Sequence, residues 1–275
     1  MHQKSLSAIA RSGYSARGIV YLIIGGLAVL AAIGGDGKTV GSKGALGTLA
    51  NETAGQLVLV LIAIGLFSYA VWRVVQSLLD ADDHGTDPKG LVIRCGLLIS
   101  ASTHFLLGLY AVSLPFTVSS DSANGSSEAV AWLMQHEFGH YLVGLAGIAI
   151  TGAGIAQVLK GLSGRYRRRL SMRPALMKLL APICAFGLTA RGIVFIIVGA
   201  FVIYAAYTVD PEQAGGLADA LHWLRAQKYG LALFAVVAAG LFSFGAYSLI
   251  EAIWRRVNAP GSDDGNPSFP EVRFL

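Results

Sequence analysis

Six long apolar stretches constrain this chain of 275 residues more than any other feature of its sequence. An α-helix needs roughly 20 mostly apolar residues to cross a hydrocarbon core about 30 Å thick, and each stretch approaches or exceeds that length. They lie at residues 18–34, 55–76, 91–114, 139–159, 179–208 and 229–252. Because the segments between them are short, we expect six membrane-spanning helices and no sizeable soluble domain.

The composition agrees with a chain that folds in lipid. Only 13% of the residues are charged, against about 25% in a water-soluble domain, and the mean hydropathy is +0.60. The 34 glycines would weaken helices in water, whereas membrane bundles use small residues to bring helix backbones together. These values predict an all-α membrane protein with closely packed helices.

The basic residues indicate how the chain is oriented. If the N-terminus is cytoplasmic, 17 of the 21 lysines and arginines fall on the inner side of the membrane. The remaining four are in outer loops: Lys38, Lys43, Arg225 and Lys228. Cytoplasmic loops of membrane proteins carry such an excess. We therefore expect a multi-pass membrane protein with both termini in the cytoplasm, and we attribute the net charge of +5 to topology rather than to nucleic-acid binding.

The sequence also repeats itself. The segment 13–21, GYSARGIVY, returns as 187–195, GLTARGIVF, and the segment 65–69, GLFSY, returns as 240–244, GLFSF. A third, more diverged copy lies between them, because its arginine at 94 and its glycines at 96 and 108 keep the spacing of those at 11, 13 and 25. Since the copy of the first helix lies in mid-chain, we do not interpret the first helix as a cleaved signal peptide.

Three two-helix units follow from this repeat, at residues 9–85, 90–170 and 179–257, and a disordered cytoplasmic tail is expected at 258–275. Two spans per unit return the chain to the same side, so all three units point the same way across the membrane. Parallel repeats of this kind are related by an axis along the membrane normal. We therefore expect six transmembrane helices, as three tandem parallel two-helix repeats, in a pseudo-threefold arrangement.

A polar stripe runs along the first helix of each unit, because residues four apart share one helix face. The stripe contains Arg17 and Tyr21 in the first unit, Ser100 and His104 in the second, and Arg191 in the third. A charged side chain that faces lipid is costly. We therefore expect the stripe to face the interior of the bundle.

Two interpretations of the arginines in this stripe remain open. Glu251, near the inner end of the last helix, is placed to form a stabilising ion pair with Arg191 of the same unit, and it joins the predicted interior polar residues. Alternatively, Arg17 and Arg191 form a positive inner vestibule for an anionic solute or a lipid headgroup.

The pattern A-R-G-I-V-Y/F in a first helix and G-L-F-S-Y/F in a second, in three tandem copies, resembles a bacterial membrane family known as domain of unknown function 1206. The resemblance covers residues 9–257; it is strong in the first and third copies and weaker in the second, where Ser100 replaces the arginine. It implies a plasma-membrane location and tandem repeats, and it brings no established activity.

The segment 136–140, HEFGH, fits the pattern H-E-x-x-H, in which two histidines on one helix face hold zinc and the glutamate is the general base. A catalytic zinc needs a third protein ligand, and no later apolar helix supplies the acidic element of an intramembrane protease. Its glycine matches Gly55 and Gly230, at which the second helix of each unit is expected to begin. Metal binding by His136 and His140 is therefore the less favoured interpretation.

His104, in the middle of the third apolar stretch, is a third weak metal candidate, since buried histidines relay protons or bind metals. We favour a ring hydrogen-bonded to a neighbouring hydroxyl or backbone oxygen. We expect no cofactor.

The basic run 165–169, RYRRR, joins the second and third units. Its place between two spans favours anionic lipid headgroups over nucleic acid as its partner. The predicted lipid contacts are Arg165, Arg167, Arg168 and Arg169. The acidic segment 80–85, DADDHG, resembles part of a calcium loop but lacks the closing glutamate, and we interpret it as a solvated linker.

Three hypotheses of function follow. The favoured one is a non-enzymatic scaffold, interaction or lipid-associated protein of the envelope, because the sequence contains no evident reaction centre. The second is a small-solute channel or carrier that uses a vestibule of Arg17 and Arg191. The third is a membrane metalloenzyme built on His136 and His140.

Overall fold

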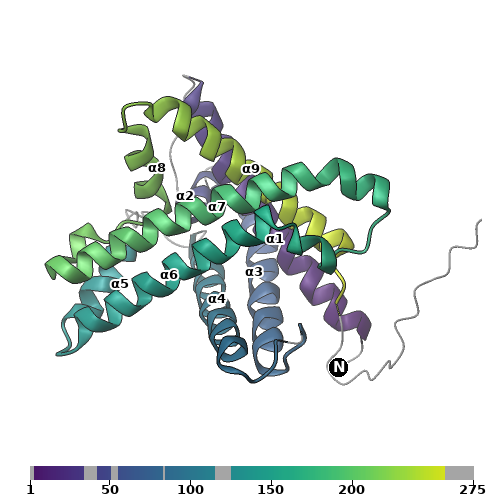
Figure 1. The fold of residues 1–275 in the computed structure, drawn as a ribbon, viewed down its shortest axis with the longest axis horizontal. Helices are drawn as coiled ribbons and strands as arrows, with labels where there is room; N and C mark the ends of the chain where they lie inside the picture. The colour runs from purple at the N-terminus through teal and green to yellow at the C-terminus, as the bar shows by residue number, and fades with distance from the viewer. Residues whose placement is uncertain (1–2, 34–41, 51–54, 83, 115–124, 258–275) are drawn as a thin grey trace, which may run out of the picture.

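The structure of this chain, a computed structural model, describes residues 3–33, 42–50, 55–82, 84–114 and 125–257, and the predicted tail at 258–275 lies outside them. Six long helices make up most of the described chain (Figure 1), in which no β-strand occurs. They are α1 (Gln3–Ala32), α3 (Gly55–Leu78), α4 (Pro88–Ser113), α6 (Gly139–Leu162), α7 (Pro174–Thr208) and α9 (Gly230–Trp254).

All six long helices are long enough and apolar enough to cross a membrane, which confirms the six predicted spans. Prolines stand at the first positions of α4 and α7, where the missing N–H costs no helical hydrogen bond. Asp87 caps α4, because its side chain accepts a hydrogen bond of 3.2 Å from the backbone N–H of Gly90. Prolines and a capping side chain, the usual signals of a helix N-terminus, therefore mark where these helices begin.

Each repeat also contains a short helix between its two long ones, which our sequence analysis did not predict. The remaining elements are α2 (Ser42–Ala50), α5 (Gly125–Met134), α8 (Leu217–Arg225), and the 3-10 turns η2 (Arg165–Arg169) and η3 (Pro211–Gln213). The next long helix begins at a glycine in every repeat, Gly55, Gly139 and Gly230, as predicted. A Cβ at Gly139 would overlap the carbonyl of Leu133, and one at Gly230 would overlap that of Arg225, so only glycine permits this tight entry into the long helix.

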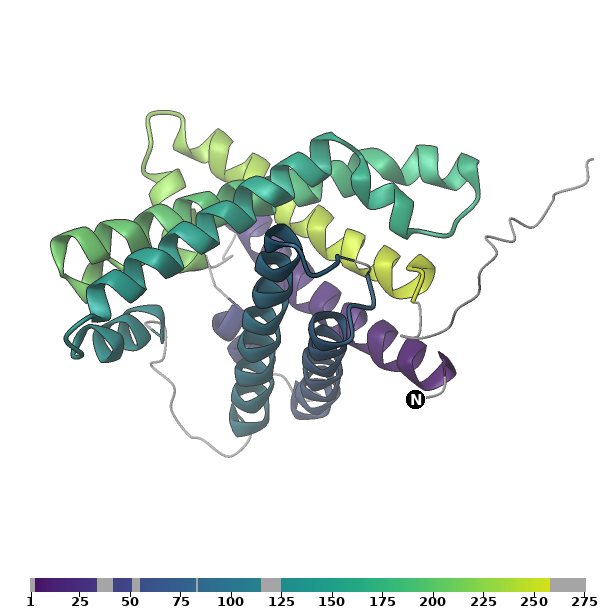
Figure 2. The ribbon, with the colours of Figure 1, turned by 60° about the horizontal axis from the view of Figure 1, so that its bottom comes forward.

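The long helices pack in antiparallel pairs that come from neighbouring repeats. α1 lies along α9, α3 along α4, and α6 along α7, while the hairpins α1–α3 and α7–α9 join these pairs. Figure 1 shows the three pairs running in different directions and crossing near the middle of the molecule. Figure 2 shows α3 and α4 diverging from α6 and α7. This order of neighbours is the one expected of three parallel repeats about one axis.

The second repeat departs from the pattern, because α4 and α6 do not pack along each other in the described residues. In the other two repeats, a Cβ at Gly13 would lie 2.5 Å from the Cα of Tyr69, and one at Gly187 would lie 2.6 Å from the Cα of Phe244. The equivalent Gly96 has nothing within 4 Å. In the most apolar segment of α4, and in that of α6, only 17% of the residues are buried. The corresponding shares are 50% for α1 and 56% for α9. The ring of helices is therefore open between α4 and α6.

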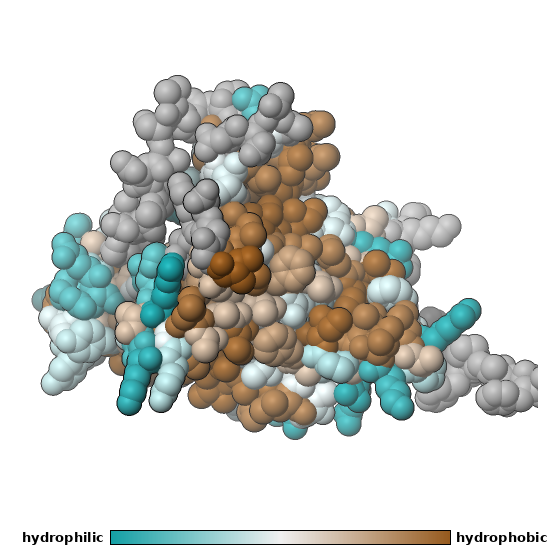
Figure 3. Space-filling model, turned by 90° about the horizontal axis from the view of Figure 1, so that it is seen from above, coloured by the Kyte–Doolittle hydropathy of each residue, from teal (hydrophilic) through white to brown (hydrophobic). Residues whose placement is uncertain are grey.

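Apolar side chains cover much of the outer surface. On the face shown in Figure 3, hydrophobic residues occupy a broad central zone, and hydrophilic side chains gather toward its edges. Leu61, Ile99 and Leu145 are each at least 60% exposed. Exposed apolar surface of this extent suits helices that span a membrane.

Candidate functional site

An arginine lies at the centre of the helix bundle. The side chain of Arg17 on α1 is only 6% exposed. It donates hydrogen bonds to Glu251 over 2.6 Å, to Ser248 over 3.1 Å and to the hydroxyl of Tyr69. Its guanidinium also stacks on the rings of Tyr14, Tyr69 and Phe244. Arg17 thus lies in the interior, as predicted, and protein groups there pair with its charge and accept its hydrogen bonds.

Glu251 on α9 pairs with two arginines, and neither of them is Arg191. Its carboxylate accepts hydrogen bonds of 2.6 Å from both Arg17 and Arg255, and its side chain is 4% exposed. The expected pairing of Glu251 with Arg191 is therefore wrong. Helices of neighbouring repeats, α1 and α9, pack more closely than the hairpin partners do, so the arginine of the first repeat reaches this carboxylate.

Arg191 on α7 has polar and aromatic partners instead. It donates to the hydroxyl of Tyr21 over 2.8 Å and to the amide oxygen of Gln157 on α6. Its guanidinium lies 4.1 Å from the ring centre of Phe195 and 4.7 Å from that of Phe244. Tyr21 is buried and packs edge-on against Phe244 at 4.8 Å. Aromatic rings therefore fill the space between the two predicted vestibule arginines.

The partners of the arginines occupy equivalent positions in the repeats. Ser248, which bonds Arg17, and Gln157, which bonds Arg191, each lie 18 residues after the glycine that begins their helix. The third residue at this position is Arg73 on α3. α3 packs against α4, where Ser100 replaces the stripe arginine. At these equivalent positions, each of the helix pairs α1–α9, α6–α7 and α3–α4 thus has a guanidinium, and in α3–α4 it comes from the second helix of a repeat rather than from the first.

His104 lies beside this third guanidinium. Its ring packs on that of Tyr69 with the centres 4.5 Å apart, and its Nδ1 lies 2.7 Å from the backbone oxygen of Ser100. Arg73 donates to the same Tyr69 hydroxyl. His104 of the polar stripe therefore takes part in packing between α3 and α4.

A second cluster joins the three repeats at one end of the molecule, and Asp82 is its centre. Asp82, between α3 and α4, accepts hydrogen bonds from Arg255, which follows α9, over 3.0 and 3.2 Å, and from Arg169 of η2 over 2.9 Å. Its side chain is 10% exposed, so the interpretation of this segment as a solvated linker is wrong for Asp82. The backbone adds to the junction, because Leu170 and Arg255 form an isolated antiparallel bridge.

The charge state of Asp82 follows from these neighbours. Burial alone would raise the pKa of its carboxyl, but Arg255 and Arg169 outweigh burial and hold the pKa below its ordinary value of 3.8. A carboxyl whose pKa is lower in the folded state stabilises the fold above its unfolded pKa, and this contribution is lost as pH falls through the lower folded pKa.

We therefore expect an acid-dependent junction. In detergent at pH 7, Asp82→Asn should lower the melting temperature of the protein, because it removes the charge that Arg255 and Arg169 face. The difference from wild type should begin to shrink below about pH 4, the ordinary pKa of an aspartate, and it should vanish only below the lower pKa at which the buried carboxyl itself is protonated. A difference that is constant from neutral to acid pH would contradict a role for the charge.

The histidines of the HEFGH segment do not form a zinc site of the expected kind. α6 begins at Gly139, so His140 lies in the helix while His136 lies in the turn before it. The H-E-x-x-H geometry needs both rings on one helix face. The ring of His136 packs on Trp132, and that of His140 packs on Tyr141. In the part of the chain that the structure describes, no three His, Cys, Asp or Glu residues are placed to hold a metal ion.

The basic run forms the 3-10 turn η2, at the same end of the molecule as Asp82. Tyr166 is buried and donates to the carbonyl of Ala181 over 2.7 Å, which ties η2 to α7. Arg169, one of the predicted lipid contacts, forms an ion pair with Asp82. Arg165, Arg167 and Arg168 are exposed, and within the described residues none of them has a carboxylate partner.

Comparison with known proteins agrees with the repeated architecture. The family model described as Domain of Unknown Function (DUF1206) matches three times, at residues 12–80, 95–164 and 186–255. The chain belongs to this family. Each match lies inside one of the three predicted units, and the arginine positions 17 and 191 and the serine at 100 fall at the same place in each match.

One relative from Bacillus subtilis (strain 168) carries the description "Uncharacterized protein YxxB". It is 30% identical over 257 residues, which cover 92% of each chain. No solved structure matches the chain. The DUF1206 description and this relative establish the family and assign it no activity.

Proposed function

We propose that this DUF1206 protein is a non-enzymatic protein of the bacterial plasma membrane that associates with anionic lipid at its cytoplasmic face, with both termini on that side. One observation carries the proposal. The arginines inside the bundle are buried or half-buried and donate hydrogen bonds to side chains of the protein. At the end where the three repeats join, by contrast, a further set of cations has no carboxylate partner in the described residues: Arg165, Arg167, Arg168 and Lys178.

Electrostatics supports lipid as the partner of these cations. Lysines and arginines next to a membrane span attract the anionic lipids of the cytoplasmic leaflet. The excess of basic residues on this side also favours its location in the cytoplasm. Among the scaffold, interaction and lipid roles, this distribution of charge favours the lipid role.

The carrier hypothesis has less support. A vestibule for an anionic solute requires Arg17 and Arg191 to face water together, but Arg17 is sealed from solvent, and both guanidinium groups pack on Phe244. The metalloenzyme hypothesis also loses support, because His136 and His140 lie on different segments.

The lipid composition around the purified protein tests the proposal. Extracted with its native lipids in polymer-bounded discs, the wild-type protein should carry more anionic phospholipid than the bulk membrane does. The variant R165Q/R167Q/R168Q/K178Q should lose this enrichment, because each cation near the surface contributes about 1 kcal/mol. A control, K43Q/K228Q, removes cations from the opposite end of the spans and should match wild type. Equal lipid composition for wild type and bulk membrane would refute the proposal.

A further inference from the structure

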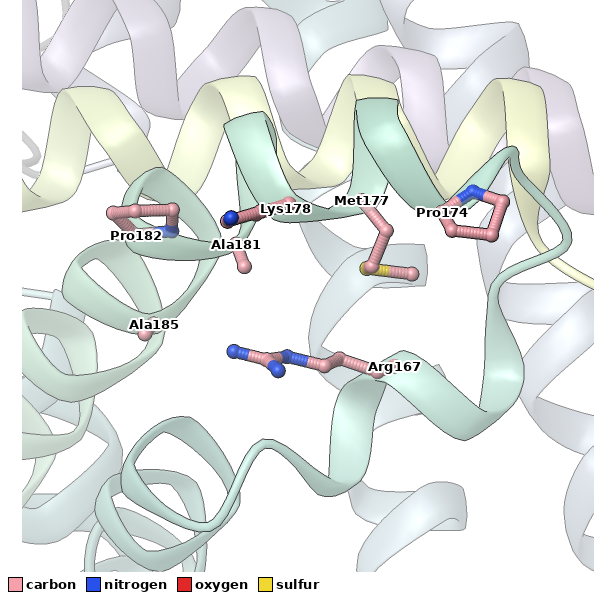
Figure 4. A pocket seen from close by; sticks show the side chains of 7 residues that line it. All are labelled: Arg167, Pro174, Met177, Lys178, Ala181, Pro182 and Ala185. Carbon is pink, nitrogen blue, oxygen red and sulfur yellow. The ribbon is translucent and has the colours of Figure 1, made fainter.

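A pocket of about 370 Å³ lies between η2 and the first half of α7. Figure 4 shows Arg167 from η2 on one side of its opening, and Lys178 on the other. The rest of the lining is largely apolar and includes Met177, Pro182 and Ala185. The pocket thus combines two cations with an apolar wall.

The two cations are available to a ligand. Neither Arg167 nor Lys178 forms an ion pair with a carboxylate in the described part of the chain, and both are exposed. Their charges therefore create a local positive potential that an anion would neutralise.

The depth of the pocket matches that of a lipid headgroup. α7 has 35 residues, which extend about 52 Å at 1.5 Å per residue, whereas the hydrocarbon core is about 30 Å thick. The first turns of α7, which form the pocket wall, therefore extend beyond the hydrocarbon to the level of the headgroups. The apolar residues of the pocket continue along α7 toward the hydrocarbon, which is the direction an acyl chain of a bound lipid would take.

A proline in the wall removes the usual partner of one backbone carbonyl in α7. Pro182 lies inside α7 and has no N–H, so it cannot make the usual helical hydrogen bond to the carbonyl of Lys178, four residues earlier. A hydroxyl group next to the phosphate of a ligand could donate to this carbonyl.

We propose that this pocket binds one anionic phospholipid with a hydroxyl-bearing headgroup. Arg167 and Lys178 hold its phosphate, and Met177 and Ala185 contact the start of an acyl chain. This inference rests on the proposed function and goes beyond it, because it replaces a general attraction to anionic lipid by one specific site.

Native mass spectrometry of the purified protein with added phosphatidylglycerol or phosphatidylcholine tests the site. The wild type should retain one phosphatidylglycerol and no phosphatidylcholine. R167Q/K178Q should bind phosphatidylglycerol about 30-fold more weakly, because each cation at such a surface contributes about a fivefold preference. R165Q/R168Q removes the same charge from the same turn outside the pocket and should bind as the wild type does.

A second pair of variants tests the apolar wall without changing charge. Ala185→Phe fills the pocket and should abolish retention of the lipid, while Ala175→Phe, on the same helix outside the lining, should not. Free glycerol 3-phosphate at the same concentration should not compete with the lipid.

The outcomes separate the site from the proposed function. An equal loss in R167Q/K178Q and R165Q/R168Q would overturn the pocket and leave general lipid association intact. No preference of the wild type for phosphatidylglycerol would overturn both. Competition by glycerol 3-phosphate as strong as that by the lipid would overturn the lipid as occupant, and unchanged binding in Ala185→Phe would overturn the placement of its acyl chain.

Discussion

Replacing Glu251 with glutamine should destabilise the protein by about 3–5 kcal/mol, because removing one partner of a buried ion pair leaves the other charge uncompensated. Here two charges are affected, since Arg17 and Arg255 both bond this carboxylate over 2.6 Å. Glutamine keeps the shape of the side chain and removes only its charge. Such a loss is a large part of the 5–15 kcal/mol that stabilises a typical protein.

Denaturant unfolding in detergent micelles measures this effect. Glu212→Gln is the matched control, because Glu212 is exposed in η3 and makes no ion pair in the described residues; it should unfold as the wild type does. If Glu251→Gln yields no folded protein while Glu212→Gln folds normally, the expectation is met. Equal stability of Glu251→Gln and wild type would show that the interior arginines do not depend on this carboxylate.

The helices of this fold could be predicted from the sequence because their signals are local. Hydropathy over about 20 residues locates each span, and the repeat placed Gly55, Gly139 and Gly230 at the starts of three helices, where the structure has them. The short helices between the spans were not predicted, since a nine-residue segment such as α2 gives too short a periodic pattern to distinguish from a loop.

The partners of the polar residues could not be predicted in the same way, because they depend on which helices become neighbours. The repeat suggested that Arg191 and Glu251, in one hairpin, would pair, whereas the structure pairs Glu251 with Arg17 of another repeat. Asp82 shows the same dependence on tertiary structure, because its two arginines come from segments 87 and 173 residues away. One signal was available in the sequence, because the linker after the first repeat carries acidic residues and the segments after the second and third repeats carry basic ones.

The opening between α4 and α6 could not be predicted from the repeat either, because a repeated sequence predicts the same packing in all three units. In the second helix of the second repeat, Ala153 stands where the other repeats have Tyr69 and Phe244. Those rings lie against Gly13 and Gly187. A methyl group offers far less contact area than an aromatic ring does, so α6 gains less by packing on α4 and, in the described residues, keeps mainly its contact with α7 of the next repeat.

Alanine at three equivalent glycines should therefore give opposite results. Gly187→Ala should destabilise the protein by about 1–3 kcal/mol, because its Cβ would lie 2.6 Å from the backbone of Phe244 and force two helices apart. Gly13→Ala should behave in the same way against Tyr69. Gly96→Ala meets nothing within 4 Å, and it should leave stability unchanged or raise it by up to about 1 kcal/mol, since alanine is the better helix former.

Unfolding of the three variants in the same detergent distinguishes an open ring from a closed one. The substitution is chemically identical at each site, and each glycine occupies the same position in its repeat, so helix propensity contributes equally and only the packing of the second helix differs. A loss at Gly96 as large as that at Gly187 would mean that α6 covers α4 in the folded protein. The three repeats would then pack alike, and the contrast between Ala153 and the aromatic residues would not determine how the second repeat folds.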